Sequence, residues 1–574
     1  MKLHALHRSD DPDAPDDAAR VLLRAHLDAR SYRPCVAAAP ALRLPQRYAG
    51  ERDLRAAAAL AVAHTFGLLD ATQAEPVAGF VAAGLDGAAD DALARADAET
   101  VLTWCIAAAE WCERHGLDLP HSRLQARAEA ADAGAPPWLR VHWRIASAWH
   151  HEAFGRRCGV ATLLAQAQAL AAGDVGLQVV VWLQQARLQL SRSAPLTALA
   201  LAERAAAHGD ARSTPLWLAH AADACARVAL ARADMHAALQ HARRAVGLGE
   251  AALAPPAYTM TYRLYEGYAL LGLGAWDEAV ALSRQLAAIT LPARLTERIR
   301  LLAQLFELVR DDRSGVWSER STDGLRRAVQ RLRELDWPDV LALLPQTIGR
   351  LWVRALDAGI ELDWLRASIV ARDLPPPQPV ATQAWPWRVR VSVLGPFALQ
   401  VEGHEGAAGD GGKAAAKPLE LLRRIAVEAG YDGAPADALA EGLWPGEGRE
   451  GRSKALEVTL ARLRKLLGHA DTVLVHERRL RLNPQRVWLD SAALAALAPA
   501  GEDAAARAEH ALALWRGPLL DGDADGPWLE AHRRRWRMRM AALLLACEPS
   551  ARHALVLRAC AADPGLACWL DAPA

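Results

Sequence analysis

The 574-residue sequence is poor in lysine, phenylalanine and tyrosine, and its eight cysteines are scattered. The closest pair, Cys105 and Cys112, lacks the two-residue spacing of zinc knuckles and redox dithiols. The uncharged run at residues 56–69 is too short and too broken to cross a bilayer, and the first ten residues lack the apolar core of a signal peptide. These absences predict a cytoplasmic protein without a metal site or membrane contact.

The charge balance excludes a chain that is basic throughout. Cationic and acidic residues number 67 each, and only five of the cations are lysine. Four of these lysines lie between Lys413 and Lys465, so a basic patch confined to one part of the chain stays open. No convincing series of nucleophile, base and orienting acid is present, and we therefore expect neither an enzyme nor a cofactor.

Residues 51–373 are rich in alanine and leucine at three- and four-residue spacing, which predicts helix after helix. Small residues pair twelve apart in units that recur every 40 or 41 residues, namely Ala186 with Ala198, Ala226 with Ala238, and Gly267 with Ala279. The last unit continues with Gly272, Gly274 and Trp276 and resembles a tetratricopeptide repeat. This periodicity predicts a solenoid of helical pairs whose concave face holds a ligand or a partner segment. Residues 1–50 lack a sustained period and are predicted to be a tail or irregular helices.

A proline-rich stretch at residues 374–387 predicts a domain boundary, because three consecutive prolines favour an extended spacer. In residues 388–490 alternating apolar positions predict two short strands near residues 389–393 and 397–401. Helices over residues 418–429, 436–443 and 453–467, then strands over 472–476 and 479–482, complete the predicted order. Strands, three helices and a hairpin in this order are typical of a winged helix-turn-helix, a DNA-reading motif.

The third predicted helix has two distinct faces. At 100° per residue, one stripe is apolar and consists of Leu456, Leu460, Leu463 and Leu467. The opposite face is basic with small residues between the charges, and residues 449–481 as a whole hold nine cations against four anions. Such a face suits a helix in the major groove. The candidate DNA-binding residues of the helix and the hairpin are Arg452, Ser453, Lys454, Val458, Arg462, Lys465, Arg478 and Arg479.

Several motifs resemble known bacterial regulators. The segments that carry the first resemblance are residues 391–397, 417–422, 443–445, 460–468, 482–484 and 487–490, and they are similar to the OmpR-type winged helix of SARP-like regulators. Residues 511–520, Trp528 and the arginines at 533–539 resemble the helical bacterial transcriptional activator domain that follows it, here residues 491–574. The preceding repeats are similar to the central region of MalT-like or LuxR-like regulators.

The resemblance implies a mainly α protein in which a tetratricopeptide-like solenoid precedes an OmpR-type winged helix-turn-helix and a small helical activator domain. It also implies a transcriptional activator that binds double-stranded DNA and contacts RNA polymerase, with head-to-tail protomers on tandem DNA repeats. Large members of the group begin with a P-loop, but no stretch here fits that pattern. The nearest stretch, residues 406–413, has one residue too many between its glycines, and Ala414 stands where serine or threonine binds magnesium.

Without a nucleotide switch, we expect a small-molecule or protein effector to act through the repeats. The alternative is a scaffold whose winged segment, residues 388–490, binds protein rather than DNA. Its support is the modest charge of residues 388–481, which hold 15 cations against 13 anions. Two further features have two interpretations each. Lys417 either neutralises a helix end or contacts phosphate, and the arginines at 533–539 form a solvated or interdomain face in preference to a second nucleic-acid patch.

Overall fold

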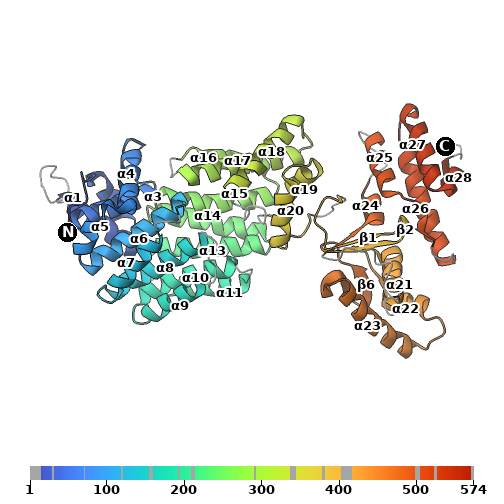
Figure 1. Ribbon diagram of the computed structural model, residues 1–574, viewed down its shortest axis with the longest axis horizontal. Coiled ribbons are helices and arrows are strands. Elements are labelled where there is room, and N and C mark those ends of the chain that lie inside the picture. Colours follow the sequence, from blue (N-terminus) through green and yellow to red (C-terminus); the bar gives the residue numbers. More distant parts are fainter. Residues whose placement is uncertain are drawn as a thin grey trace. The chain divides into compact units, whose positions relative to one another are not determined.

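The computed structural model describes residues 14–28, 32–69, 71–117, 121–153, 159–191, 194–208, 214–289, 293–335, 344–377, 382–402, 416–497, 504–522 and 527–570. The chain forms two compact units, Met1–Arg331 and Leu332–Ala574. Helices dominate both units and the described strands all lie in the second, which confirms the predicted mainly helical class (Figure 1). Among the described residues, no helix is long and apolar enough to span a membrane.

The first unit begins with a group of helices around one large hydrophobic cluster. They are α1 (Ala14–Asp28), α2 (Arg33–Ala38), α3 (Glu51–Thr65), α4 (Ala71–Ala83), α5 (Asp90–Arg95), α6 (Ala98–His115) and α7 (His121–Asp132). Leu22 of α1 and Leu54 of α3 are both fully buried in this cluster. The sequence predicts a tail or irregular helices over residues 1–50, whereas α1 is a regular helix of the core. Its 15 residues are too few for a sustained period to stand out beside the surrounding prolines.

The remainder of the first unit is a succession of helices that pack on their neighbours along the chain. They are α8 (Pro137–Ala153), α9 (Val160–Leu170), α10 (Val175–Ser191), α11 (Pro195–Ala207), α13 (Pro215–Ala231), α14 (Met235–Ala251), α15 (Pro256–Gly272), α16 (Trp276–Ala287), α17 (Ala293–Arg313) and α18 (Glu319–Glu334). Many begin with proline, which fits the first turn of a helix because its missing N–H would have no partner there. This succession fits the predicted helical repeat.

The small residues that define the sequence period lie where the helices approach one another. Ala186, Ala198, Ala226 and Ala238 are all fully buried. A side chain at Gly267 would place its Cβ 3.1 Å from the ring of Phe306 in α17, so only glycine fits that approach without displacement. The period therefore reports close packing between helices, as the sequence indicates.

The later helices of the first unit also pack against its N-terminal helices. Helix α17 packs on α6. The ring of Tyr258 in α15 lies 5.7 Å from the ring of Tyr32 and 5.2 Å from that of Phe66, both measured between centroids. The helical array is therefore joined to the N-terminal helices by more than the chain itself.

The second unit begins with two helices and continues into the winged segment. Its elements are α19 (Gly349–Asp357), α20 (Leu362–Ala371), β1 (Val389–Ser392), β2 (Gly395–Pro396), β3 (Ala398–Val401), α21 (Ala416–Arg424), β4 (Ala434–Pro435), α22 (Ala436–Leu443), α23 (Arg449–Leu466), β5 (Val473–His476), β6 (Arg479–Leu482) and β7 (Val487–Leu489). A π-helical turn, Ile425–Ala429, extends α21. These elements follow the predicted order, and α23 begins four residues earlier than predicted. The stretch at residues 406–413 lies outside the described residues.

Two small sheets hold the winged segment together. One has the strand order β3-β1-β7, with β1 antiparallel to β3 and parallel to β7. The other has the order β4-β6-β5, in which β5 and β6 form the hairpin. Val389 and Val391 of β1 are fully buried, as the alternation of apolar residues predicts.

The C-terminal helices are built onto the winged segment. They comprise α24 (Asp490–Ala496), α25 (Ala504–Leu514), α26 (Pro527–Leu545), α27 (Pro549–Ala562) and α28 (Ala567–Leu570), with strand β8 (Leu519–Asp521) among them. Strand β8 pairs with β2. A Cβ atom added at Gly395 of β2 would lie 2.8 Å from the Cβ of Arg516, so this approach requires glycine. The buried carboxylate of Asp490 accepts the backbone N–H groups of Val393 and Leu394, each at 2.9 Å. The winged segment and the C-terminal helices therefore share one structural junction.

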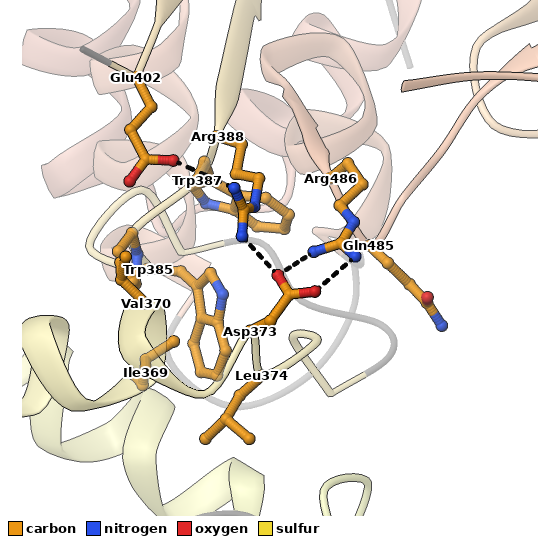
Figure 2. A pocket seen from close by; sticks show the side chains of 11 residues that line it. Ile369, Val370, Asp373, Leu374, Trp385, Trp387, Arg388, Glu402, Gln485 and Arg486 are labelled. Carbon is orange, nitrogen blue, oxygen red and sulfur yellow. Dashed lines mark hydrogen bonds and ion pairs between the residues drawn. The ribbon is translucent and has the colours of Figure 1, made fainter. Parts of the chain in front are cut away.

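Within the second unit, the end of α20 is joined to the winged segment by an ion-pair cluster (Figure 2). Asp373, just after α20, accepts hydrogen bonds of 2.7 Å from both Arg388 and Arg486. Hydrogen bonds from Arg486, and then from Arg388, lower the pKa of Asp373 to about 2. The cavity beside them measures only about 20 Å³, roughly the space of one water molecule, so this is a structural junction rather than a ligand site. The sequence places a boundary at residues 374–387, whereas the compact units divide at Arg331–Leu332.

This junction predicts that the winged segment is more stable with α19 and α20 attached. We expect a fragment of residues 344–574 to unfold with a free energy about 2 kcal/mol higher than residues 380–574, because the shorter fragment exposes Trp385. Urea titrations of the two fragments measure the difference. Equal unfolding free energies would show that α20 and Asp373 contribute nothing to the stability of this unit.

Candidate nucleic-acid interface

The third helix of the winged segment, α23, is fixed by one apolar face. Leu456 and Leu460 are buried, and Leu463 and Leu467 are fully so. The helix starts after Gly448, whose extended backbone leads into the first turn. Leucines at this three- and four-residue spacing can be buried together only if the opposite face points outward. The predicted division of α23 into an inner and an outer face therefore agrees with the observed burial.

The outer face of α23 presents cations without protein partners. Ser453, Lys454, Arg462 and Lys465 are exposed, and so is Val458, with 46% of its surface accessible. Within the described part of the chain, the side chains of Lys454, Arg462 and Lys465 make no hydrogen bond or ion pair. An anion that approaches this face therefore meets positive charges whose existing interactions need not be broken.

Arg464 of the same helix has a different role. Its guanidinium donates two hydrogen bonds, of 2.6 and 3.2 Å, to the backbone carbonyl of Val473 at the start of β5. These bonds attach the end of α23 to the hairpin. Among the cations of this basic stretch, Arg464 thus stabilises the fold rather than facing outward.

Replacing Arg464 with lysine keeps the positive charge but removes the paired hydrogen bonds to Val473, so it tests the structural role of those bonds. We expect Arg464→Lys to lower the unfolding free energy by about 1 kcal/mol, because one ammonium group cannot reproduce the paired guanidinium bonds. Urea unfolding measures this, and Arg462→Lys on the exposed face is the matched control with no expected loss. If both variants were equally stable, the bonds to Val473 would contribute nothing.

Carboxylates of α22 hold several neighbouring arginines. Asp437 lies 3.2 Å from Arg449 and 3.8 Å from Arg478, while Glu441 lies 3.9 Å from Arg452. These pairs are largely exposed, so each contributes little to stability and exchanges readily for another anion. Two predicted site residues, Arg452 and Arg478, therefore carry carboxylate partners that the sequence analysis did not anticipate.

Of the two predicted hairpin arginines, Arg478 lies at the exposed tip and Arg479 is hydrogen-bonded to the backbone. At its tip, Glu477 and Arg478 both have positive φ angles, 48° and 61°, as a two-residue type I′ turn requires. The Arg478 side chain is 75% exposed. Arg479 instead donates to the backbone carbonyl of Gly433. Its guanidinium is therefore anchored beside β4 while its side chain stays exposed.

Arg481 is a functional candidate that the sequence analysis did not select. It follows Arg479 by two residues on β6, where exposed and buried positions alternate, so both arginines share the outer face of the strand. Its side chain makes no ion pair or hydrogen bond to any residue that the structure describes. The alternation of arginine and leucine over residues 479–482 was the available signal.

Two other groups of cations have structural roles. Lys417 donates to the Leu443 carbonyl at the end of α22, at 3.3 Å, and therefore neutralises a helix end. In α26, Arg533 donates to the Leu519 carbonyl at 3.0 Å, and Arg537 binds Asp563 at 2.9 and 3.1 Å. These arginines hold the C-terminal helices together, which agrees with an internal role and gives no support to a second nucleic-acid patch.

These features define a mainly helical protein with an exposed basic helix beside a hairpin, joined to a compact group of C-terminal helices. Residues 488–563 match the family model of the bacterial transcriptional activator domain. The matched region begins in β7 and ends at Asp563, the partner of Arg537. This similarity supports a bacterial transcriptional activator. The chain has no match among curated proteins or solved structures.

Proposed function

We propose that the protein is a sequence-specific, DNA-binding transcriptional activator with a helical-repeat arm that receives its signal. The observation that carries this proposal is the outer face of α23, where Lys454, Arg462 and Lys465 are exposed and lack partners among the described residues. This face lies in the same compact unit as the segment similar to bacterial transcriptional activator domains. No chemical step is part of the proposed function.

In this proposal α23 enters the major groove, whose width admits one α-helix. Arg462 and Lys465 reach phosphates or guanine edges, and Ala461 on the same face is small enough for close approach. Val458 supplies an apolar contact of the kind that the methyl group of thymine accepts. Arg452, Ser453 and Lys454 extend the contact toward the start of the helix. Arg478, Arg479 and Arg481 of the hairpin contact the adjacent backbone.

The remaining parts supply the partners of a regulator. The C-terminal helices contact RNA polymerase, and two protomers bind head to tail on direct DNA repeats, as the family resemblance implies. A small-molecule or protein effector acts on the helical arm, residues 51–373. The arm thereby sets whether the winged segment engages its site.

Selection from a randomised duplex library, at low and at physiological salt, tests the proposal. We expect the full-length protein to enrich a repeated motif, and the bound fraction to fall as salt rises because phosphate contacts release counterions. Enrichment only by residues 344–574 would mean that the arm masks the winged segment. If neither protein enriches a sequence, the scaffold alternative replaces the regulator.

Asp437 offers a second test on the same surface. We expect Asp437→Asn to tighten DNA binding about two- to fivefold, because it frees Arg449 and Arg478 and removes one negative charge near the phosphates. Fluorescence anisotropy on the selected duplex measures the effect. Asp432→Asn, at an exposed aspartate on a neighbouring turn, is the control with a smaller expected change. Weaker binding by Asp437→Asn would instead show that Asp437 orients the arginines for DNA.

A further inference from the structure

A cavity in the first unit lies where separate parts of its core meet. It measures about 110 Å³ and is bounded by α1, α8, α13 and the start of α10. Its lining residues include Arg24, Leu27, Trp138, His142, Leu177 and Trp217. Leu27 belongs to the N-terminal hydrophobic cluster and Trp217 to a cluster of the repeats, while Leu177 packs on a third. Sites between such cores are common positions for small-molecule binding.

The walls of this cavity favour a flat apolar group. Two indole rings, of Trp138 and Trp217, line it together with aliphatic side chains from α1 and α10. Trp217 and Leu27 are almost fully buried, so the ring of Trp217 and the methyl groups of Leu27 are held in place by the surrounding core, while Trp138 is half-buried. The volume is about three quarters of the roughly 150 Å³ of an engineered cavity that holds a benzene ring, so one ring is the largest group that it admits. A one-ring aromatic group therefore matches both the size and the lining.

The polar groups of the cavity determine the charge of the ligand. The Arg24 guanidinium lies over the Trp138 ring, 4.5 Å from its centroid, and has no carboxylate partner among the described residues. The other charged lining group, Asp174, accepts the backbone N–H of Leu177 at 3.1 Å and caps α10, where the helix dipole offsets its charge. Arg24 is thus the uncompensated charge of the site.

His142 adds a neutral polar group. Burial, and then the nearby His26, lowers the pKa of His142 to about 4, so its ring is uncharged near neutral pH. A neutral imidazole carries one N–H donor and one nitrogen acceptor, so His142 can accept a hydrogen bond. The cavity therefore combines two indoles, one unpaired cation and one neutral acceptor.

We propose that this cavity binds a small aromatic carboxylate, with its ring against Trp138 and Trp217 and its carboxylate paired with Arg24. The inference rests on the proposed role of the arm as the receiver of a signal, and it names the chemical class of that signal. Because the ligand would touch α1, α8, α10 and α13 together, its binding stabilises one arrangement of the N-terminal helices against the repeats.

Calorimetric titration of the full-length protein with benzoate, benzamide and benzylamine tests the inference without DNA. We expect benzoate to bind at least tenfold more tightly than the other two, since a charge-assisted bond to Arg24 contributes about that factor. Arg24→Gln should abolish the preference. Arg20→Gln, on the same helix but outside the cavity lining, should keep it. Preferential binding of benzylamine or benzamide, or no binding by any of the three, would overturn the proposal.

A cavity-filling variant locates the bound ring. Leu177→Trp places a larger side chain in the cavity and should abolish benzoate binding while the protein still unfolds in a cooperative thermal transition. Undiminished benzoate binding by this folded variant would overturn the assignment of the site. Since these measurements use no DNA, they remain decisive even if the duplex selection fails, and a failed titration leaves the DNA-binding proposal standing.

Discussion

Replacing Arg462 and Lys465 together with alanine is expected to weaken DNA binding about 10- to 100-fold at low salt. Each side chain is exposed on α23 and lacks a partner among the described residues, so its contribution is available to phosphate or to a base edge. The slope of the logarithm of affinity against the logarithm of salt concentration should fall by about two, one for each lost phosphate contact. Alanine favours helix formation, so the fold should be retained.

Fluorescence anisotropy at several salt concentrations measures both the affinity and the slope. The matched control removes two exposed arginines from α26, Arg534→Ala with Arg535→Ala, which lie outside the proposed interface of the same unit. We expect this control to change the slope by much less. An unchanged slope in the α23 variant would remove Arg462 and Lys465 from the interface.

Replacing Asp490 with alanine is expected to lower the unfolding free energy of the second unit by about 3 kcal/mol. The carboxylate is 1% exposed and accepts backbone N–H groups from Val393, Leu394 and Ser491 at 2.8 to 2.9 Å. Its removal leaves buried donors without partners, and each such donor costs about 1 to 3 kcal/mol. Denaturant titration measures the loss, with Asp432→Ala as an exposed control that should have little effect.

The same carboxylate makes stability depend on pH. Burial raises the pKa of Asp490 to about 6, above the ordinary value of 3.8. Between about pH 4 and pH 6 the folded protein therefore holds a proton that the unfolded chain releases, so this group's contribution to stability falls as the pH rises. The fall is of the order of 3 kcal/mol over this window. Asp490→Ala should lose it, so the stability deficit of the variant should be larger at pH 4.5 than at pH 7. A deficit that grew toward pH 7 would contradict the raised pKa.

Features that depend on the spacing of neighbouring residues could be predicted from the sequence. The faces of α23 could be assigned because four leucines at helical spacing have to share one side, and all four are buried. The hairpin could be placed because two short strands flank the Glu477–Arg478 turn, and arginine alternates with leucine in the second of them. Such patterns depend on a few neighbouring residues, and their outcome does not require knowledge of the rest of the fold.

Interactions between distant residues could not be predicted in this way. Asp437 and Arg478 are 41 positions apart, and Asp490 and Val393 are 97 apart. Nothing in the spacing of either pair identifies its partner. The sequence therefore does not predict that Arg464 binds a backbone carbonyl while the side chain of Arg462 has no partner among the described residues. Nor does it predict that the ion pairs of Asp373 join α20 to the winged segment. Functional and structural arginines look alike until the backbone has brought their partners close.

The contact between α17 and α6 changes how the arm should lose its structure. In an open array each repeat touches only its neighbours, so stability is nearly a sum of nearest-neighbour contributions and the ends can fray one repeat at a time. Here the later helices also rest on the first ones, and Tyr258 is shared with the N-terminal core. Loss of an end repeat would therefore disturb contacts far away in the sequence. The first unit should accordingly respond to heat or to a bound ligand as one cooperative body instead of as a row of independent modules.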